Sequence, residues 1–375
     1  MNRDVYLDHA ASSPMTETVA DFLQETFRRK LGNSSSVHRS GVASSLELEK
    51  ARQVVADRIG ARTDEIYFVS GATEANNLAL KGIVDRYKTS KKNKIIISAL
   101  EHSSVSQVAS WLREMGCEIV HAPVDSSGLL SVAKLKELLD ERTLLVSIGH
   151  VSSEIGVIQN LHEIGELCAQ VQAFFHSDGA QAFCKAPVDV KAMRLHLYSM
   201  SSHKIHGPRG AGALYVSDQV RIRPQILGGG QEGGLRSGTV PVELIAAMAY
   251  ASEQFQQVAL ERLRDLRAEL LEGLCHSFPD VRVHGDLKER VGSQLNFALP
   301  GVDGKYAMRE LDRRGIRVSV GSACDSGKKA PSASLKALGL TDEQAFEALR
   351  VSWGLETSSD DIQALLAALE EIRKP

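Results

Sequence analysis

Short apolar runs alternate with longer amphipathic stretches over most of this chain, from about residue 16 to residue 250. Such alternation is typical of βαβ units and of a mainly parallel sheet. The runs that we expect to form buried strands are residues 66–69, 95–97, 144–148, 173–176, 195–200 and 213–216. We therefore predict an α/β protein whose large domain, residues 14–255, is built around a mainly parallel central sheet.

The pattern changes after residue 256. Leucines then recur at three- and four-residue spacing, which indicates one face of a long amphipathic helix, at positions 260, 263, 266, 270, 271 and 274. Beyond that helix, residues 294–297 and 316–319 have the character of strands, and a last helix is expected over about 359–372. Residues 256–375 are thus predicted to form a smaller α+β domain.

Composition and charge are those of an ordinary soluble protein. The chain has 375 residues, of which 43% are hydrophobic and 24% are charged. Its 44 basic and 47 acidic side chains leave a formal charge of −3, so we expect neither a nucleic acid nor a membrane as partner. The N-terminus has no apolar signal core, and no apolar run approaches the length of a membrane span, so a cytoplasmic protein is expected.

The five cysteines are scattered, odd in number, and contain no C-x-x-C pair. We therefore expect neither a disulfide framework nor a metal site. Cys117, Cys168, Cys184 and Cys275 lie in apolar or helical surroundings and are predicted to be small core residues. Cys324 differs, because the small, polar, glycine-bearing residues 319–327 around it favour an exposed loop.

Two charged residues follow apolar runs at places where a sheet would present its ligand-binding edge. Asp178 ends the run that starts at residue 173, and Lys204 lies just beyond the run 195–200. In open α/β sheets, ligands bind beyond the carboxyl ends of the strands. A carboxylate and an amine at that edge suit pyridoxal phosphate (PLP), whose aldehyde condenses with lysine and whose pyridinium nitrogen pairs with aspartate. Taken singly, either residue would be an ordinary loop-end side chain.

Two further segments fit the same cofactor. Residues 70–77 are small and polar and lead from a strand into a helix, whose free N–H groups and positive end suit a phosphate. Thr73 adds a hydroxyl there, although an ordinary capped helix start fits the segment equally well. His102 follows the run 95–97, so its ring could stack on the pyridine face.

At this point two motifs resemble a known family. The segment SSHKIHGP, residues 201–208, resembles the lysine motif of the class V aminotransferase superfamily. The segment GSAC, residues 321–324, resembles the active-site cysteine loop of the group I cysteine desulfurases, the NifS/IscS-like enzymes. The similarity extends from Tyr6 to Ser352 with the motifs in the order of the family. It implies the fold type I PLP-enzyme architecture, residues 1–13 packing on the small domain, and a homodimer.

The resemblance also implies roles for individual residues around the phosphate. Thr73, Ser201 and His203 would hold the phosphate of PLP. Thr239 would reach the phosphate bound in the partner subunit, which requires shared sites.

Other residues match family positions around the ring and the substrate. His102 would stack on the pyridine ring, and Gln181 would hydrogen-bond its phenolic oxygen. Arg350 would pair with the substrate α-carboxylate, a role that suits the planar, bidentate guanidinium.

The resemblance predicts a sulfur-transfer reaction on L-cysteine. Lys204 would remove the Cα proton, Cys324 would attack the substrate sulfur and become a persulfide, and alanine would leave. An ordinary cysteine titrates near pH ~8.5, so the thiol needs local help, from His102 or from Lys328 and Lys329. A sulfur-acceptor protein and a role in iron–sulfur cluster biogenesis are expected for such an enzyme.

Two positions depart from the family pattern. Where group I enzymes usually carry Asn-Asn-Glu-x-Gly, this chain has SSEIG, residues 152–156, so Ser153 lacks the amide that contacts the substrate carboxylate. Losing a hydrogen bond to a charged group, about 1.5–3 kcal/mol, would lower turnover by one or two decades. Asp325 replaces a Thr or similar residue, and its charge should disfavour the Cys324 thiolate. The chain also ends at Pro375 without the longer tail that some desulfurases use to dock a scaffold, which leaves that docking open.

The principal hypothesis is therefore a PLP-dependent cysteine desulfurase. Another class V PLP enzyme, a lyase or aminotransferase acting on a related amino acid such as selenocysteine, is a first alternative. A weakened homologue that serves as a sulfur-relay or regulatory partner is a second, supported by Ser153 and Asp325. Sulfide and alanine production separates the principal hypothesis from both.

Overall fold

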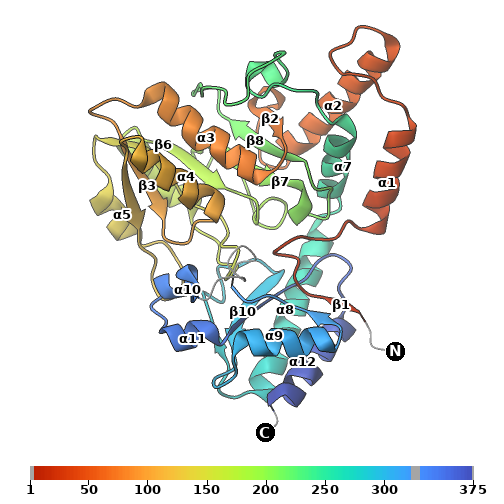
Figure 1. Cartoon of the computed structure of the whole chain (residues 1–375), viewed down its shortest axis with the longest axis vertical. Coiled ribbons are helices and arrows are strands. Elements are labelled where there is room, and N and C mark those ends of the chain that lie inside the picture. The colour runs from red at the N-terminus through yellow and green to blue at the C-terminus, as the bar shows by residue number, and fades with distance from the viewer. Residues whose placement is uncertain (1–3, 322–329, 374–375) are drawn as a thin grey trace.

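The structure is a computed structural model that describes residues 4–321 and 330–373. Among these residues, seven strands form a central sheet with helices on both faces (Figure 1). Across the sheet the strands follow the order β2 (Ile66–Val69), β8 (Gly212–Val216), β7 (Leu197–Ser201), β6 (Phe174–Asp178), β5 (Thr143–Ser147), β3 (Lys94–Ser98) and β4 (Glu118–Ala122). Neighbours from β4 to β7 are parallel, whereas β8 is antiparallel to both β7 and β2. The predicted mainly parallel sheet is confirmed.

Alternating residues of the strands bury the two faces of this sheet against different helices. On β3, Ile95 and Ile97 belong to the core formed with α3 (Ala72–Tyr87) and α4 (Ser103–Glu114). Ile96 points the other way, into the core shared with α5 (Val132–Leu138) and α6 (Leu161–Gln170). A strand buried on both faces reads as a continuous apolar run, which is why most central strands were predictable.

Three helices pack beside this sheet. The first two, α1 (Glu17–Arg28) and α2 (Arg39–Asp57), both pack on α7 (Val242–Glu253). Short 3₁₀ turns connect other elements at Thr63–Glu65, Ser202–Lys204 and Glu232–Gly234.

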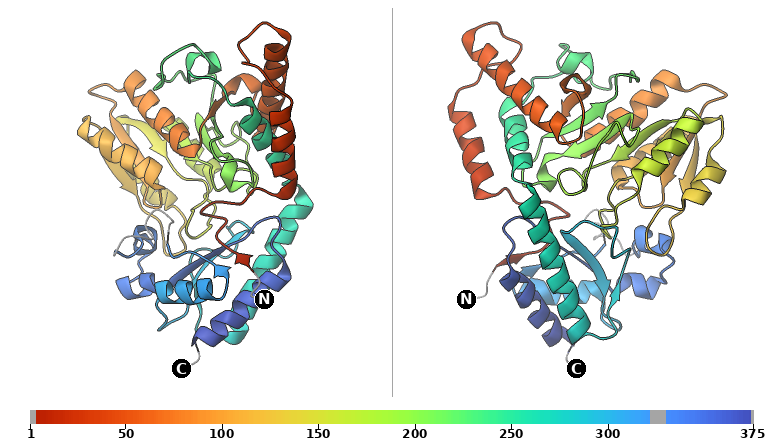
Figure 2. Two further views of the ribbon diagram at one scale, coloured as in Figure 1. Left: turned by 45° about the vertical axis from the view of Figure 1, so that its right-hand side comes forward. Right: turned by 180° about the vertical axis from the view of Figure 1, so that it is seen from behind.

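The long helix α8 (Gln257–Ser277) leads from this part of the chain to a second group of elements (Figure 2). Its predicted apolar face is confirmed at the buried residues Leu263, Leu266, Leu270 and Leu274. Cys275 on the same helix is exposed, so its prediction as a core residue was wrong. Position 275 directly follows a buried leucine, and neighbouring residues of a helix face different directions.

The second group contains two small sheets. In the first, β10 (Gln294–Ala298) pairs antiparallel with β12 (Ala348–Ser352) and β9 (Arg282–Val283). In the second, β1 (Val5–Tyr6) pairs in parallel with β11 (Ile316–Arg317). The helices of this group are α9 (Gly304–Arg313), α10 (Ala333–Ala337), α11 (Asp342–Phe346) and α12 (Ser359–Arg373). The limits 14–255 and 256–375 assigned to two domains stay a prediction.

Four strands were not predicted: β1 and β9, which have only two residues each, and the longer strands β4 and β12. The edge strand β4 has the sequence EIVHA and is largely uncovered, so it lacks a continuous apolar run. The strand β12 carries Arg350 at its centre, and this charged residue is buried with its whole strand. Burial of that arginine depends on partners from distant parts of the chain, which a local pattern does not contain.

Candidate active site

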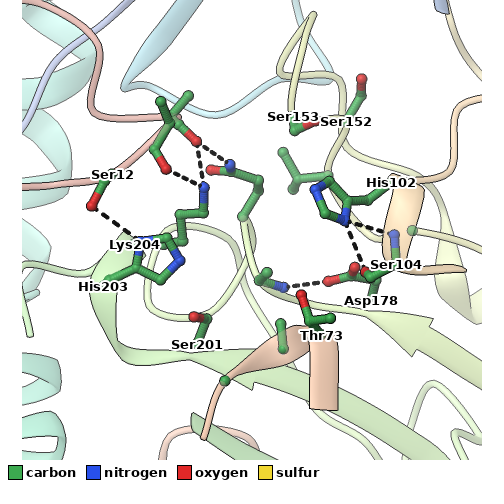
Figure 3. Close-up of a pocket in the computed structure, with 18 of the residues that line it drawn as sticks. Ser12, Thr73, His102, Ser104, Ser152, Ser153, Asp178, Ser201, His203 and Lys204 are labelled. Carbon is green, nitrogen blue, oxygen red and sulfur yellow. Dashed lines mark hydrogen bonds between the residues drawn. The ribbon is translucent and has the colours of Figure 1, made fainter. Parts of the chain in front are cut away.

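A cavity of about 480 Å³ lies at the carboxyl ends of the parallel strands (Figure 3). Its wall includes residues that end or follow β3, β5, β6 and β7. The predicted site residues that line it are Thr73, His102, Ser153, Asp178, Gln181, Ser201, His203, Lys204 and Arg350. Side chains that are widely separated in the sequence therefore meet at the predicted edge of the sheet.

The remaining predicted residues lie elsewhere. Thr239 is exposed and outside the cavity wall of its own chain. Cys324, Asp325, Lys328 and Lys329 lie outside the described residues.

Asp178 is the last residue of β6, and two donors hold its carboxylate. Asn76 Nδ2 donates to Oδ2 at 2.7 Å, and the backbone N–H of Ala180 donates to Oδ1 at 2.9 Å. The same Asn76 nitrogen lies 2.8 Å from Ser104 Oγ. Asn76 is fully buried on α3, and sequence analysis assigned it no role. The only hint of such a role in the sequence was an amide side chain among the apolar residues of a helix.

Lys204 follows β7 within a single 3₁₀ turn, so its amine enters the cavity beside Asp178's strand. Its Nζ donates to the carbonyl oxygens of Ala10 at 2.6 Å and Ala11 at 2.7 Å. Gln181 Nε2 donates to the same Ala10 oxygen at 2.8 Å. The N-terminal segment is thus a wall of the cavity, which sequence analysis did not predict.

A second lysine is close enough to interact with Lys204 electrostatically. Lys185 lies four positions after Gln181, and burial together with the Lys204 charge lowers the pKa of Lys185 to about 7. Lys185 does not line the described wall of the cavity. Of the two amines, only Lys204 therefore faces the space in which a ligand fits.

The start of α3 forms a cradle of backbone N–H groups and hydroxyls. The helix begins after Gly71, which has no side chain to cap it and has φ +155°. A Cβ on Gly212 of β8 would lie 2.6 Å from the Gly71 Cα, so this close approach requires glycine. Thr73 and Ser201 add hydroxyls to the wall of the same cavity.

His203 stands on the same side of the cavity as Lys204 in Figure 3. Its Nδ1 lies 3.2 Å from Ser12 Oγ. Burial, and then the positive charge of Lys204, lower the pKa of His203 to about 4. The ring is therefore neutral at physiological pH in this state and can act as a hydrogen-bond donor or acceptor.

On the opposite side, His102 is the N-cap of α4 and lies near Asp178 (Figure 3). Its Nδ1 accepts the backbone N–H of Ser104 at 3.1 Å and lies 2.8 Å from Ser104 Oγ. These contacts fix the ring plane. A neutral ring with Nδ1 as acceptor carries its proton on Nε2.

The neighbouring Glu101 is a site residue to which the sequence alone assigned no role. Its Oε1 accepts the backbone N–H of Gly149 at 2.7 Å, while Oε2 is buried without a partner among the described residues. Burial, with a contribution from the charge of Asp178, raises the pKa of Glu101 to about 8. The Glu101 carboxyl group therefore mostly keeps its proton near neutral pH.

Arg350 is buried, with 1% of its side chain exposed. Its Nη1 donates to the carbonyl oxygen of Ser153 at 3.0 Å, and its Nη2 donates to Asp8 Oδ1 at 2.8 Å. The Ser153 side chain was expected to affect binding of the substrate carboxylate; the contact of this residue with Arg350 is made by its main-chain carbonyl. The effect of a serine hydroxyl at this position on substrate binding stays a prediction.

The polar groups of this cavity fit PLP. The cradle at α3 offers uncharged N–H and hydroxyl donors for a phosphate, which helix N-termini bind well. Asp178 supplies a buried, fully oriented carboxylate for the pyridinium nitrogen, and Lys204 supplies the amine. Within the described residues, no group of three or more His, Cys, Asp or Glu side chains could hold a metal ion.

The fold and this site together define a fold type I PLP-dependent enzyme. The model of the family described as aminotransferase class-V matches residues 5–365, and the chain belongs to this family. No helix in the described ranges is both long and apolar enough to cross a membrane.

Relatives of named function match over nearly the whole chain. The cysteine desulfurase IscS of Photobacterium profundum is 40% identical, with 100% of this chain and 94% of that protein covered. The cysteine desulfurase IscS of Dictyoglomus turgidum is 37% identical, with 99% and 95% covered.

Solved structures also match nearly the whole chain. A NifS-like protein has a TM-score of 0.91 at 31% identity, with 99% of both chains covered. SspA in complex with cysteine has a TM-score of 0.84 at 31% identity, with 94% of this chain and 100% of that chain covered.

Proposed function

We propose that this protein is a PLP-dependent cysteine desulfurase that converts L-cysteine to L-alanine and passes the sulfur to Cys324 as a persulfide. The observation that carries this proposal is the meeting of Asp178, Lys204 and Arg350 in one cavity. Relatives named cysteine desulfurase along the full chain support it, as does a similar structure in complex with cysteine.

Each side chain would hold one part of the cofactor. Thr73, Ser201 and His203 would bind the phosphate, and Asp178 would keep the ring nitrogen protonated. His102 would stack on the ring, and Lys204 would attach covalently through the aldehyde carbon. When bound, PLP supplies an electron sink that weakens the bonds at Cα of an amino acid.

The substrate would be oriented by charge and then lose a proton. Arg350 would hold the α-carboxylate, since its guanidinium faces the cavity and keeps N–H groups beyond the two used by Ser153 and Asp8. The freed amine of Lys204 would take the proton from Cα. Gln181 would orient the phenolic oxygen of the cofactor once its amide shifts from the carbonyl of Ala10.

Cys324 would receive the sulfur. Its thiolate attacks the substrate sulfur, an S–S bond forms, the Cβ–S bond breaks, and that electron pair stays on the carbon skeleton, which gains protons and leaves as alanine. Gly321, the last described residue before Cys324, lies beside Glu154, with 3.5 Å from an ideal Cβ to Oε1. Glu154 adjoins Ser153 of the cavity wall. The described chain therefore comes close to the cavity wall at Gly321, three positions before Cys324 in the sequence.

The test is a sulfide and alanine assay on the purified PLP-loaded protein, with and without a thiol reductant. Equal amounts of sulfide and alanine are expected, with faster turnover when reductant discharges Cys324. Cys324→Ala should abolish sulfide release and leave the PLP absorbance intact. Borohydride should trap PLP on Lys204 and not on the neighbouring Lys185. Full activity in Cys324→Ala, or no adduct on Lys204, would overturn the proposal.

A homodimer with shared sites belongs to the same proposal. The segment that carries Thr239 contacts the start of α3 through an ion pair, in which Arg236 Nε lies 2.8 Å from Glu74 Oε1. Thr239 itself is exposed, as a residue must be if it serves a neighbouring subunit. Large apolar residues are also exposed on α1, on α2 and in the loop between them: Phe27, Val37, Val42 and Leu46.

A sulfur-acceptor protein would complete the reaction, because a persulfide must be discharged for the next turnover.

A further inference from the structure

The positive charge of Arg350 already has a carboxylate partner when no substrate is present. Asp8 Oδ1 accepts from Nη2 at 2.8 Å, and the pair joins residues that are 342 positions apart in the sequence. The other recorded contact, with the carbonyl of Ser153, is to a neutral group. Nε of Arg350 is buried without a partner among the described residues. Asp8 is therefore the charged group that balances Arg350 in this part of the structure.

The two members of the pair differ in their surroundings. The Arg350 side chain is 1% exposed and lines the cavity, whereas that of Asp8 is 22% exposed and does not belong to the described cavity wall. Asp8 thus approaches the guanidinium from the side of the N-terminal segment, and a ligand in the cavity approaches it from another. An incoming α-carboxylate would place two negative charges on one buried guanidinium.

We propose that Asp8 competes electrostatically with the substrate α-carboxylate for Arg350, so that it stabilises the ligand-free protein and weakens substrate binding. This inference rests on the proposed function, since it takes an amino acid as the ligand of Arg350. It makes Asp8 a positioning residue, which acts on the substrate through Arg350.

The electrostatic argument has two parts. A buried cation without a partner destabilises a protein strongly, so Asp8 is needed most when the cavity holds no carboxylate. Once the substrate binds, its carboxylate can neutralise Arg350 directly. The charge of Asp8 then repels the substrate across a short distance, and at the effective dielectric of a partly exposed site such repulsion is substantial.

Contacts that do not involve the Asp8 charge also hold the N-terminal segment in place. The backbone of Leu7 accepts the N–H of Ser352 at 2.9 Å, and the N–H of Ala10 donates to Ser352 Oγ at 2.8 Å. Asn at position 8 has the shape of Asp and keeps an oxygen that can accept from Arg350. Asp8→Asn therefore removes the charge and leaves the local bonding in place.

The experiment compares wild type, Asp8→Asn and a matched control, Asp4→Asn. Asp4 lies on the same segment and pairs with Arg317, but both side chains are exposed. In Asp8→Asn, KM for L-cysteine and the inhibition constant of L-alanine should fall about three- to tenfold, with kcat unchanged. L-alaninamide, which has no carboxylate, should bind all three proteins equally. The melting temperature of PLP-free Asp8→Asn should fall by a few degrees, and Asp4→Asn should match wild type.

Opposite changes in affinity and stability distinguish competition from a structural role. A residue that only holds the site together would raise KM as it lowers the melting temperature. A raised or unchanged KM in Asp8→Asn, or an equal change for L-alaninamide, would overturn the inference. If wild type makes no sulfide, the proposed function fails, yet L-alanine and L-alaninamide titrations monitored by PLP absorbance still decide the role of Asp8.

A measurement on wild type covers the case in which Asp8→Asn does not fold. Hydrogen exchange of the peptide over residues 4–8 is followed in the PLP-loaded protein with and without L-alanine. Competition for Arg350 predicts faster exchange when L-alanine is bound. Unchanged or slower exchange would overturn the inference.

Discussion

The Asp178 carboxylate depends on Asn76, a buried amide that contacts both Asp178 and Ser104. Replacing Asn76 with Ala would remove a hydrogen bond to a charged group, about 1.5–3 kcal/mol. We expect PLP to bind about ten- to a hundredfold more weakly, measured by titrating the PLP-free protein. Asn77→Ala, one residue along the same helix, is the control and should bind PLP like wild type. An Asn76→Ala protein with unchanged PLP affinity would contradict the role of this amide.

Glu101 makes the stability of the protein depend on pH in a defined direction. Its pKa is raised from 4.5 to about 8, so between these values the folded protein keeps a proton that the unfolded chain releases. The stabilisation is complete below about pH 4.5 and is lost as the pH rises to about 8, by an amount on the order of a few kcal/mol.

Glu101→Gln removes this titration and keeps an oxygen for the N–H of Gly149. We expect the free energy of unfolding of Glu101→Gln minus that of wild type to increase steadily from pH 5 to pH 8. Chemical denaturation of the PLP-free proteins at several pH values measures this difference. The control is Glu114→Gln, at the exposed end of the same helix α4. A difference from wild type that does not change with pH would show that Glu101 is ionised in the folded protein.

At the scale of elements, the phosphate cradle exists because two backbones come unusually close. A Cβ at position 212 would lie 2.6 Å from Gly71 Cα and 2.7 Å from Met200 O, and neither backbone atom can rotate away. Gly212→Ala should therefore displace the start of α3 from β8. We expect a loss of stability of about 1–3 kcal/mol together with weaker PLP binding.

The matched control for Gly212→Ala is Gly149→Ala, in the same cavity wall. There the nearest atom to a new Cβ is Glu101 Oε2 at 3.6 Å, an ordinary contact distance. Thermal unfolding of both variants, with and without PLP, provides the comparison. Equal melting temperatures for Gly212→Ala and Gly149→Ala would contradict the close-approach argument.

At the scale of the whole molecule, the cavity joins three parts of the chain. The central sheet supplies Asp178 and Lys204, the three-stranded sheet supplies Arg350, and the N-terminal segment crosses between them (Figure 1). Ser13 N–H donates to the His203 carbonyl at 2.9 Å where this segment passes Lys204. The site therefore forms only when these parts have packed together.

The proposed dimer gives a prediction at this scale. Phe27 on α1 and Leu46 on α2 are 55% and 61% exposed. If they lie at the subunit interface, Phe27→Asp with Leu46→Asp should give monomers in light scattering and weaken PLP binding, because the Thr239 of a partner is lost. Val258→Asp is the control, since Val258 is 76% exposed on α8. A dimeric double variant would rule out this surface as the interface.

Much of the fold could be predicted from local patterns. The strand β2 matched its predicted bounds, and the ends of the other predicted strands of the central sheet lie within two residues of their predicted positions. Strands buried on both faces are continuous apolar runs, and helices repeat their apolar residues every three or four positions. The edge strand β4 and the arginine-bearing β12 lack these signals, so they were missed.

The residues of the site also divide into those that local sequence predicted and those that it did not. Asp178 and Lys204 were predictable because each lies at or just beyond the carboxyl end of a strand, and the end of a parallel strand marks the ligand edge. Asp8, Asn76 and Glu101 were not assigned roles, because each is defined by a partner far away in the sequence.

The sequence by itself determined which segments become strands and helices and which charged residues stand at their ends, since both depend on neighbouring residues. Only the tertiary structure decided that Ala10 faces Lys204, that Asp8 balances Arg350, and that Glu101 is buried near Asp178. The physical reason is that pairing and desolvation depend on distance in space. Groups as far apart in the chain as Asp8 and Arg350 acquire their partners and their burial only through packing.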